Sequence, residues 1–175
     1  MALLSIITAP DPRLKVKCKP VERVDRQVRQ LMDDLLETMY AAPGIGLAAP
    51  QVGVRKRVLV VDAAKDAEKP APLRMANPEI LWTSEERVSY EEGCLSLPDQ
   101  YAPVERPARC RVRYLDENDE LREREIEGML ATCVQHEIDH LDGVLFVDHL
   151  SALKRGMILR KLAKAKRSRV SATAA

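Results

Sequence analysis

The sequence predicts an α+β fold, with antiparallel β-sheets packed around a central helix that carries an HExxH motif. Three observations support this prediction. Short strand-like segments fill the middle of the chain, a strongly apolar helix follows them, and amphipathic helices stand near both ends. Because the strands precede the central helix instead of alternating with helices, antiparallel sheets are favoured over a parallel one.

The length and composition indicate one domain with an aliphatic core. The chain has 175 residues, of which 46% are hydrophobic but only 3% aromatic. Its formal net charge of +1 selects no class of partner. We expect a single catalytic domain at residues 1–166 and a disordered basic tail at residues 167–175. No hydrophobic run could span a bilayer, and we expect the apolar start MALLSIITAP to be a strand or docked arm, not a signal peptide.

The first helix is expected after an irregular, proline-containing segment. Asp25 is a good N-cap, and apolar residues recur with the helical period up to about Tyr40. The glycine- and proline-rich stretch Ala41–Gln51 then predicts a tight loop. Either this loop is a plain connection, or its backbone approaches a ligand, with Gln51 offering a polar side chain.

Alternating or apolar runs predict the strands, and the polar stretch Ala63–Ala76 predicts a loop. The turn Asp116–Glu120 joins the last two strands into a hairpin. The predicted strands are Arg57–Asp62, Asn77–Trp82, Glu86–Tyr90, Arg109–Leu115 and Leu121–Ile126.

The central helix is expected between Gly128 and Gly143, with Gly143 as a left-handed C-cap. Residues 129–134 are almost all apolar, so this helix should be buried on most sides. After a short linker, Ser151 should cap a last helix. Its apolar face is expected to comprise Leu153, Met157, Ile158 and Leu162.

The segment from Ser151 to the end is basic and has no acidic residue. The simpler interpretation is a solvated helix end, and the alternative is contact with RNA. The basic residues are Lys154, Arg155, Arg160, Lys161, Lys164, Lys166, Arg167 and Arg169.

His136, Glu137 and His140 form the HExxH motif. Residues four apart share one face of a helix, so both imidazoles can face one metal ion. Glu137 can reach a water at that ion without being a ligand. The pattern indicates metal-assisted hydrolysis, although two histidines could also fall four apart in an ordinary core.

A catalytic site of this kind needs a third protein ligand. His149 is one candidate, but its surroundings resemble a solvated helix start. The carboxylates of Asp139 and Asp142 are possible, yet Asp139 should point elsewhere on the helix. A thiolate together with imidazoles suits zinc or ferrous iron better.

Cys94 is the best cysteine candidate, because it lies in a glycine-flanked turn beside two glutamates. We expect Cys18 to be peripheral, Cys110 to face the core, and Cys133 to line the site on the His136 face. The four cysteines are scattered without a CxxC pair, which favours reduced thiols in a cytosol-like compartment.

Three stretches together resemble peptide deformylase: GIGLAAPQ at Gly44–Gln51, EGCLSLP at Glu92–Pro98 and QHEIDHLDG at Gln135–Gly143. The N-terminal stretch IITAPDPRLKVKCKPV is also similar to that family, so the resemblance covers all but the tail. It implies hydrolytic removal of the N-formyl group from nascent polypeptides that begin with formyl-methionine.

The resemblance also implies residue roles. Cys94, His136 and His140 would bind one divalent metal ion, ferrous iron in the cell, with zinc, nickel or cobalt tolerated. Glu137 would move the proton, and the oxyanion would be held by the Gln51 amide and the Leu95 backbone N–H. The Gly46 backbone would hold an extended substrate. The methionine pocket would be walled by Ile45, Tyr90, Met129 and Cys133.

One position departs from the pattern, because Tyr101 stands where many bacterial members have arginine. This puts contacts further along the substrate in doubt. Two rival functions remain at this point: an HExxH endopeptidase, and a non-enzymatic protein that binds ribosomal RNA through its tail. We expect a cytoplasmic monomer with no membrane contact, and a possible ribosome contact through the tail.

Overall fold

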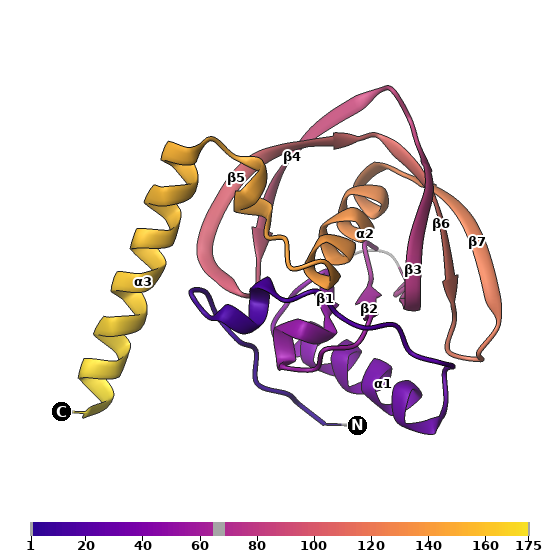
Figure 1. Ribbon diagram of the computed structural model, residues 1–175, viewed down its shortest axis with the longest axis horizontal. Helices are drawn as coiled ribbons and strands as arrows, with labels where there is room; N and C mark the ends of the chain where they lie inside the picture. The colour runs from indigo at the N-terminus through magenta and orange to yellow at the C-terminus, as the bar shows by residue number, and fades with distance from the viewer. Residues whose placement is uncertain (1, 65–68, 175) are drawn as a thin grey trace.

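A computed structural model describes residues 2–64 and 69–174 of the chain (Figure 1). It confirms the α+β class: two antiparallel sheets surround α2, with α1 and α3 outside them. The helices are α1 (Arg26–Ala41), α2 (Gly128–Leu141) and α3 (Ala152–Ala174), with short 3-10 turns η1 (Pro12–Lys15), η2 (Ala49–Val52) and η3 (Phe146–His149). The strands are β1 (Gly46–Ala48), β2 (Val58–Val61), β3 (Leu73–Thr83), β4 (Arg87–Cys94), β5 (Leu97–Pro107), β6 (Arg109–Leu115) and β7 (Leu121–Glu127).

The larger sheet has the strand order β1-β2-β3-β6-β7, and helices cover both of its faces near β2. Side chains alternate between the faces of a strand. Leu59 and Val61 pack in the same core cluster as α2, whereas Val58 and Val60 pack in the cluster that contains α1. This two-sided burial explains why β2 is apolar at every position.

α2 runs through the middle of the molecule, where its apolar residues pack against the larger sheet (Figure 1). Ala131, Val134 and Leu141 are fully buried in this core. The helix ends as predicted, because Gly143 has a φ of +74°. A Cβ at Gly143 would lie 2.7 Å from the Lys15 backbone, so the chain beyond η1 packs directly on the end of α2.

The smaller sheet is the hairpin β4–β5, and β5 is a strand that the sequence did not predict. Its prolines explain the omission, because a proline cannot donate to a central ladder. β5 pairs only with β4, so Pro98 and Pro103 lie in a strand that needs no N–H donors for a second partner strand. β4 ends at Cys94, directly before the turn of this hairpin, close to where the sequence placed Cys94.

Other boundaries were predicted well or need correction. α1 and the hairpin β6–β7 lie within one residue of their predicted ranges. The predicted loop Ala41–Gln51 contains β1 and part of η2. The predicted loop Ala63–Ala76 ends earlier than expected, because β3 begins at Leu73. Residues 65–68 of that second loop lie outside the described chain. Cys18 is not peripheral: it is buried in the α2 core.

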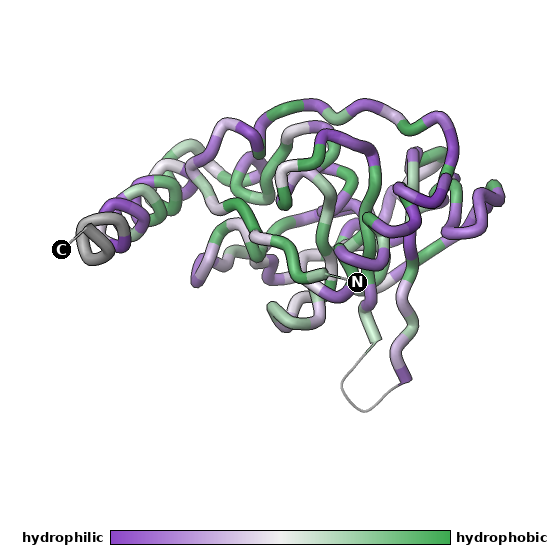
Figure 2. Tube along the Cα trace, turned by 90° about the horizontal axis from the view of Figure 1, so that it is seen from below, coloured by the Kyte–Doolittle hydropathy of each residue, from purple (hydrophilic) through white to green (hydrophobic). Residues whose placement is uncertain are grey.

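α3 is capped as predicted, since the Lys154 N–H donates to the Ser151 hydroxyl at 3.3 Å. Its contact face differs from the prediction, because Leu153 is 70% and Met157 46% exposed, while Leu162 is buried. The apolar contact of α3 with the body comes from Ile158, Leu159 and Leu162. Figure 2 shows hydrophilic and hydrophobic residues alternating along the helix. The helix also extends to Ala174, where the sequence led us to expect a disordered tail from residue 167. Arginine and alanine, which supply four of the eight residues 167–174, are good helix formers.

The N-terminal residues form a docked arm on α1, one of the two predicted forms. The Ala2 N–H donates to Asp34 at 2.8 Å, and the Leu4 N–H donates to the Thr38 hydroxyl at 2.9 Å. Within the described chain, no helix is long and apolar enough to cross a membrane.

Candidate metal centre and active site

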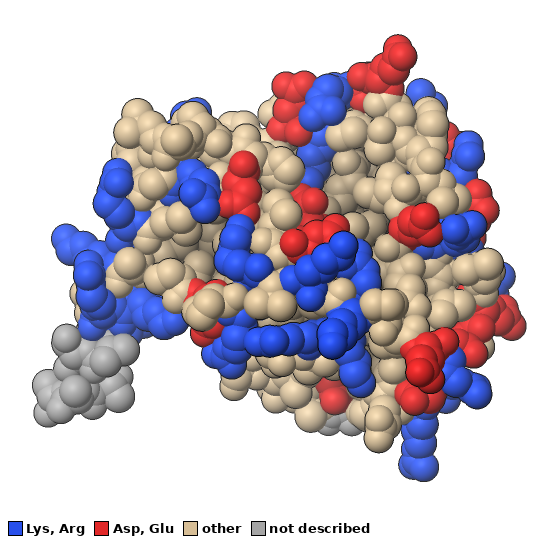
Figure 3. Space-filling view, viewed as in Figure 1, with Lys and Arg blue, Asp and Glu red and all other residues tan. Residues whose placement is uncertain are grey.

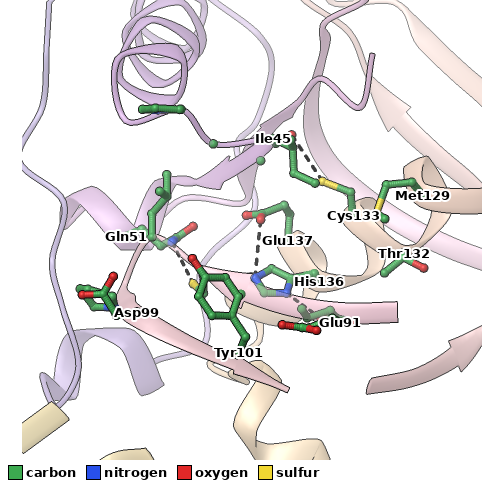
Figure 4. A pocket seen from close by; sticks show the side chains of 18 residues that line it. Ile45, Gln51, Glu91, Asp99, Tyr101, Met129, Thr132, Cys133, His136 and Glu137 are labelled. Carbon is green, nitrogen blue, oxygen red and sulfur yellow. Dashed lines mark hydrogen bonds and ion pairs between the residues drawn. The ribbon is translucent and has the colours of Figure 1, made fainter. Parts of the chain in front are cut away.

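The motif side chains of α2 and the end of β4 meet at a cavity of about 420 Å³ between β1, β4–β5 and α2. The cavity is lined by most of the residues that the sequence singled out, including Gln51, Cys94, His136 and Glu137. Figure 4 shows the side chains of Gln51, His136 and Glu137 converging from separate elements of the fold.

Cys94, His136 and His140 form a potential metal site. Their ligand atoms all lie within 4.8 Å of one another, and Cys94 Sγ is 3.3 Å from His140 Nε2. Among the described residues, no other group of histidine, cysteine and acidic side chains converges in this way. One thiol and two imidazoles suit zinc or ferrous iron, and three protein ligands leave a position open, as catalytic sites require. The donor set therefore fits the ion that the sequence predicts.

His136 is held in place by a buried ionic network. Its Nδ1–H donates to Glu92 at 2.9 Å, which leaves Nε2 free to bind a metal ion. Arg106 donates to both oxygens of Glu92, at 2.7 and 3.0 Å, and to Asp139 at 2.9 Å. Burial alone would raise the pKa of Glu92, but the hydrogen bonds from His136 and Arg106 outweigh it and hold that pKa below its ordinary value.

The other candidates for the third ligand have hydrogen-bond or ion-pair partners of their own. His149 Nε2 lies 2.8 Å from Asp139, so His149 extends the network at the surface, away from the three ligands. Asp139 points toward Arg106 and His149, as its helix position predicted. Asp142 accepts from Arg57 at 2.9 Å. Cys110 is fully buried in the core, as predicted.

Glu137 lines the cavity beside His136. Its side chain is buried, its Oε1 is 3.8 Å from His136 Nε2, and its Oε2 has no hydrogen-bond partner in the described chain. Burial raises the pKa of Glu137 to about 7, the range in which a carboxylate can both take and return a proton. A buried carboxylate oxygen without a hydrogen-bond partner lowers the stability of the fold unless a bound ligand supplies that partner.

Gln51 is oriented by its own loop. Its side-chain oxygen accepts from the Ala48 N–H at 2.9 Å. The amide nitrogen must then face the other way, where it lies 3.0 Å from Ser96 Oγ and 3.5 Å from Cys94 Sγ. Leu95, beside Cys94, lines the same cavity. A donor is therefore preset next to the metal ligands.

Three of the four residues expected to wall the methionine pocket line this cavity. Ile45, Met129 and Cys133 line the cavity, and Cys133 Sγ lies 3.4 Å from the Ile45 carbonyl oxygen, to which it donates (Figure 4). Burial raises the pKa of the Cys133 thiol well above its ordinary value, which favours the neutral thiol, and Cys133 is not part of the converging ligand group. Tyr90 is not among the lining residues: it lies earlier on β4, opposite Val104 of β5.

Comparison with known proteins identifies this arrangement. The family model for polypeptide deformylase matches residues 3–156. A peptide deformylase of Mesorhizobium japonicum is 59% identical over 164 residues, which cover 94% of this chain and 93% of the relative. The chain belongs to the polypeptide deformylase family.

Solved deformylases share the fold as well. The crystal structure of peptide deformylase from Ehrlichia chaffeensis has a TM-score of 0.92 and 42% identity, covering 97% of this chain and 99% of that one. A structure of the Ehrlichia enzyme in complex with actinonin has a TM-score of 0.91 and 44% identity, covering 95% and 99%. The chain is thus a deformylase, a hydrolase that removes the formyl group from N-terminal formyl-methionine.

Two features of this deformylase site escaped the sequence analysis. Arg106 points inward from β5, and the residues two positions before and after it, Val104 and Ala108, are buried as well. A charged residue among such inward-facing apolar residues indicates a buried partner of opposite charge, which here is Glu92. The sequence left the role of Tyr101 open. Its ring lies at the rim of the cavity against Gly93, where a Cβ would be only 2.5 Å from it.

Gly46→Ala should impair catalysis without removing the metal ligands. A Cβ at Gly46 would lie 2.7 Å from Glu137 Oε1 and 2.9 Å from its Cγ, so Glu137 must move. A displacement near 1 Å can cost roughly 10²-fold in rate. We expect a loss of that order in kcat on a formylated dipeptide, with the metal retained. Gly156→Ala in α3, where the added Cβ meets only the end of Arg160, is the control. Wild-type kcat in the Gly46 variant would show that Glu137 tolerates displacement.

Proposed function

We propose that this chain deformylates nascent polypeptides with a single divalent metal ion held by Cys94, His136 and His140. The observation that carries the proposal is the convergence of these three ligand atoms beside Glu137, whose Oε2 has no partner in the described chain. When bound, the ion would act as a Lewis acid on the formyl carbonyl and would make a water acidic enough to attack.

The protein side chains would then perform the remaining work. Glu137 would take the proton of the attacking water through Oε2 and return it to the departing amine. The Gln51 amide, fixed by the Ala48 N–H, and the backbone N–H of Leu95 would donate to the oxygen that gains charge. The wall formed by Ile45, Met129 and Cys133 would bind the methionine side chain.

We propose that the ion is ferrous iron in the cell, with zinc, nickel or cobalt as replacements. The thiolate–imidazole donor set supports this choice. The test is anaerobic purification, metal analysis and an assay on formyl-Met-Ala, with an N-acetylated peptide as the negative substrate. Iron-containing enzyme should lose activity in air as iron or Cys94 oxidises. Full activity after long aerobic storage of an iron-loaded sample would contradict the proposal, and activity in a metal-free sample would contradict any metal role.

We also propose that the protein is a cytoplasmic monomer. Its four cysteines are free, as expected for a reducing compartment, and every ligand of the site comes from one chain. Size-exclusion chromatography with light scattering tests the oligomeric state. A dimer at micromolar concentration would contradict this part of the proposal.

α3 is proposed to touch the ribosome through its exposed basic side chains. Cutting the chain after Lys166 keeps Leu162 in the core and keeps the Lys166 contacts with the Thr8 and Pro10 carbonyls. We therefore expect unchanged turnover of formylated peptides. Ribosome binding should weaken in the truncated protein and should fall steeply with salt in the full chain, as measured by co-sedimentation. No binding of the full chain at low salt would favour the solvated helix end.

A further inference from the structure

Four basic side chains outside the catalytic site lie together without acidic partners. Lys17 and Lys19 come from the segment between η1 and α1, and Arg55 and Lys56 come from the turn between η2 and β2. All four are exposed, and none forms an ion pair within the part of the chain that the structure describes. We call this group the Lys17 patch.

The backbone holds the Lys17 patch in a fixed arrangement. Lys19 pairs with Lys56 in a parallel bridge; the Lys19 N–H donates to the Arg55 carbonyl at 3.2 Å, and the Arg57 N–H donates to the Lys19 carbonyl at 3.0 Å. Neighbouring strands lie about 4.8 Å apart, so the two lysines stand side by side. Like charges in opposed positions destabilise a fold, and an anion bound across them would offset that cost.

The segment that carries the two lysines is held to the end of α2 through Cys18. The Cys18 N–H donates to the Leu141 carbonyl at the end of α2 at 2.8 Å, and the Cys18 side chain is buried. Because residues in extended backbone alternate, Lys17 and Lys19 both face solvent on either side of this anchor. The charges therefore project from a rigid part of the fold and not from a loose tail.

The basic residues next to the patch are neutralised, which separates it from α3. Lys15 and Arg155 both bind Asp148, and Arg57 binds Asp142 at 2.9 Å. Figure 3 shows one face of the molecule, on which lysine and arginine side chains gather across the middle and again along α3. The Lys17 patch is thus a local group of unpaired positive charge on a chain whose net charge is only +1.

We propose that the Lys17 patch binds the phosphate backbone of RNA. This partner rests on the deformylase function, because the substrate is a newly made chain and such chains emerge beside RNA. None of the exposed large hydrophobic side chains of the described chain belongs to segments 15–20 or 53–57, so the patch lacks the apolar residues that membrane surfaces need. It also lacks aromatic rings for base stacking, which makes the contact one of charge and independent of sequence.

The test compares two variants with the same charge change in the metal-loaded enzyme. The patch variant carries K17Q, K19Q, R55Q and K56Q. The control carries R23Q, R87Q, R113Q and R122Q, which remove arginines that are already paired with acids. Binding of a labelled 20-nucleotide RNA is followed by fluorescence anisotropy from 25 to 200 mM salt. Equal-length duplex DNA and vesicles containing phosphatidylserine are the competing anions.

We expect the patch variant to lose at least tenfold in RNA affinity and the control much less. Loss of four phosphate contacts should lower the salt slope by roughly 3, at about 0.7–0.9 per contact. Turnover of formyl-Met-Ala should be unchanged in both, which separates this proposal from the catalytic one. A charge-preserving variant, K17R/K19R/R55K/K56R, should bind like wild type and shows that the patch tolerates substitution.

Several outcomes would overturn the proposal. These are no RNA binding by wild type at 25 mM salt, an equal loss in the patch and control variants, or tighter binding to the vesicles than to RNA. Loss of the difference between the two variants after truncation at Lys166 would also overturn it, because α3 would then be the RNA contact. Duplex DNA that competes with the RNA in wild type but not in the patch variant would support a contact with the phosphate backbone.

Discussion

Glu137→Gln should keep the metal and lose deformylation by at least roughly 10²–10⁴-fold, the usual contribution of a positioned general base. The substitution preserves size and can still hydrogen-bond a water, but it cannot accept a proton. Since Oε2 of Glu137 has no partner in the described chain, the variant should leave no broken contact and should keep near-native stability. Metal content, thermal melting and kcat/KM on formyl-Met-Ala are measured on the same preparation.

The control for this variant is Glu91→Gln, which removes an exposed carboxylate that lines the same cavity but stands on β4. It should change kcat little. KM should change less than kcat in the Glu137 variant, because the methionine wall and the Gly46 backbone are untouched. A Glu137 variant that keeps its metal and turns over like wild type would remove Glu137 from the mechanism.

Cys94→Ala should lose the tightly bound ion and, with it, essentially all activity. Two imidazoles from one helix cannot complete a three-ligand site. Cys94 Sγ lies 3.3 Å from His140 Nε2, and among the described residues no other cysteine joins the two histidines in a potential metal site. Atomic absorption after dialysis, together with deformylation at saturating substrate, measures both losses.

Cys133→Ala is the matched control, because this thiol lines the same cavity without being among the proposed ligands. It should retain the ion and show its effect mainly in KM, through the methionine wall. Full metal occupancy in Cys94→Ala after dialysis would disprove the ligand assignment, even if activity were low.

Much of the fold could be predicted because local pattern and burial agree. The alternation of β6–β7, the N-cap at Asp25 and the glycine at Gly143 each act through neighbouring residues, and each prediction was confirmed. β5 could not be predicted, because its prolines forbid a central strand and only tertiary pairing with β4 shows that it is not central. The contact face of α3 also depends on tertiary geometry: the helix touches the body over only part of its length.

The site residues were predicted from motifs, and not from the pattern of burial. The HExxH spacing works through helix geometry alone, and the Cys94 assignment needed the resemblance of its whole motif. The Glu92–Arg106 ion pair was missed, because the two residues lie on different strands and no local sequence pattern links them. The one available sign was a charged residue among inward-facing apolar residues of β5. Tyr90 was placed in the pocket by resemblance, and the described cavity does not include it.

β1 has a consequence for how broadly the enzyme can act. It is a three-residue strand at the edge of its sheet, bonded on one side only, next to the cavity. A peptide that adds to such an edge can pair its main chain over two or three residues and no further. Recognition would then stop shortly after methionine, so that one enzyme could serve proteins of every downstream sequence. An edge so short is also a poor template for a second copy of the chain, which limits self-association through this exposed backbone.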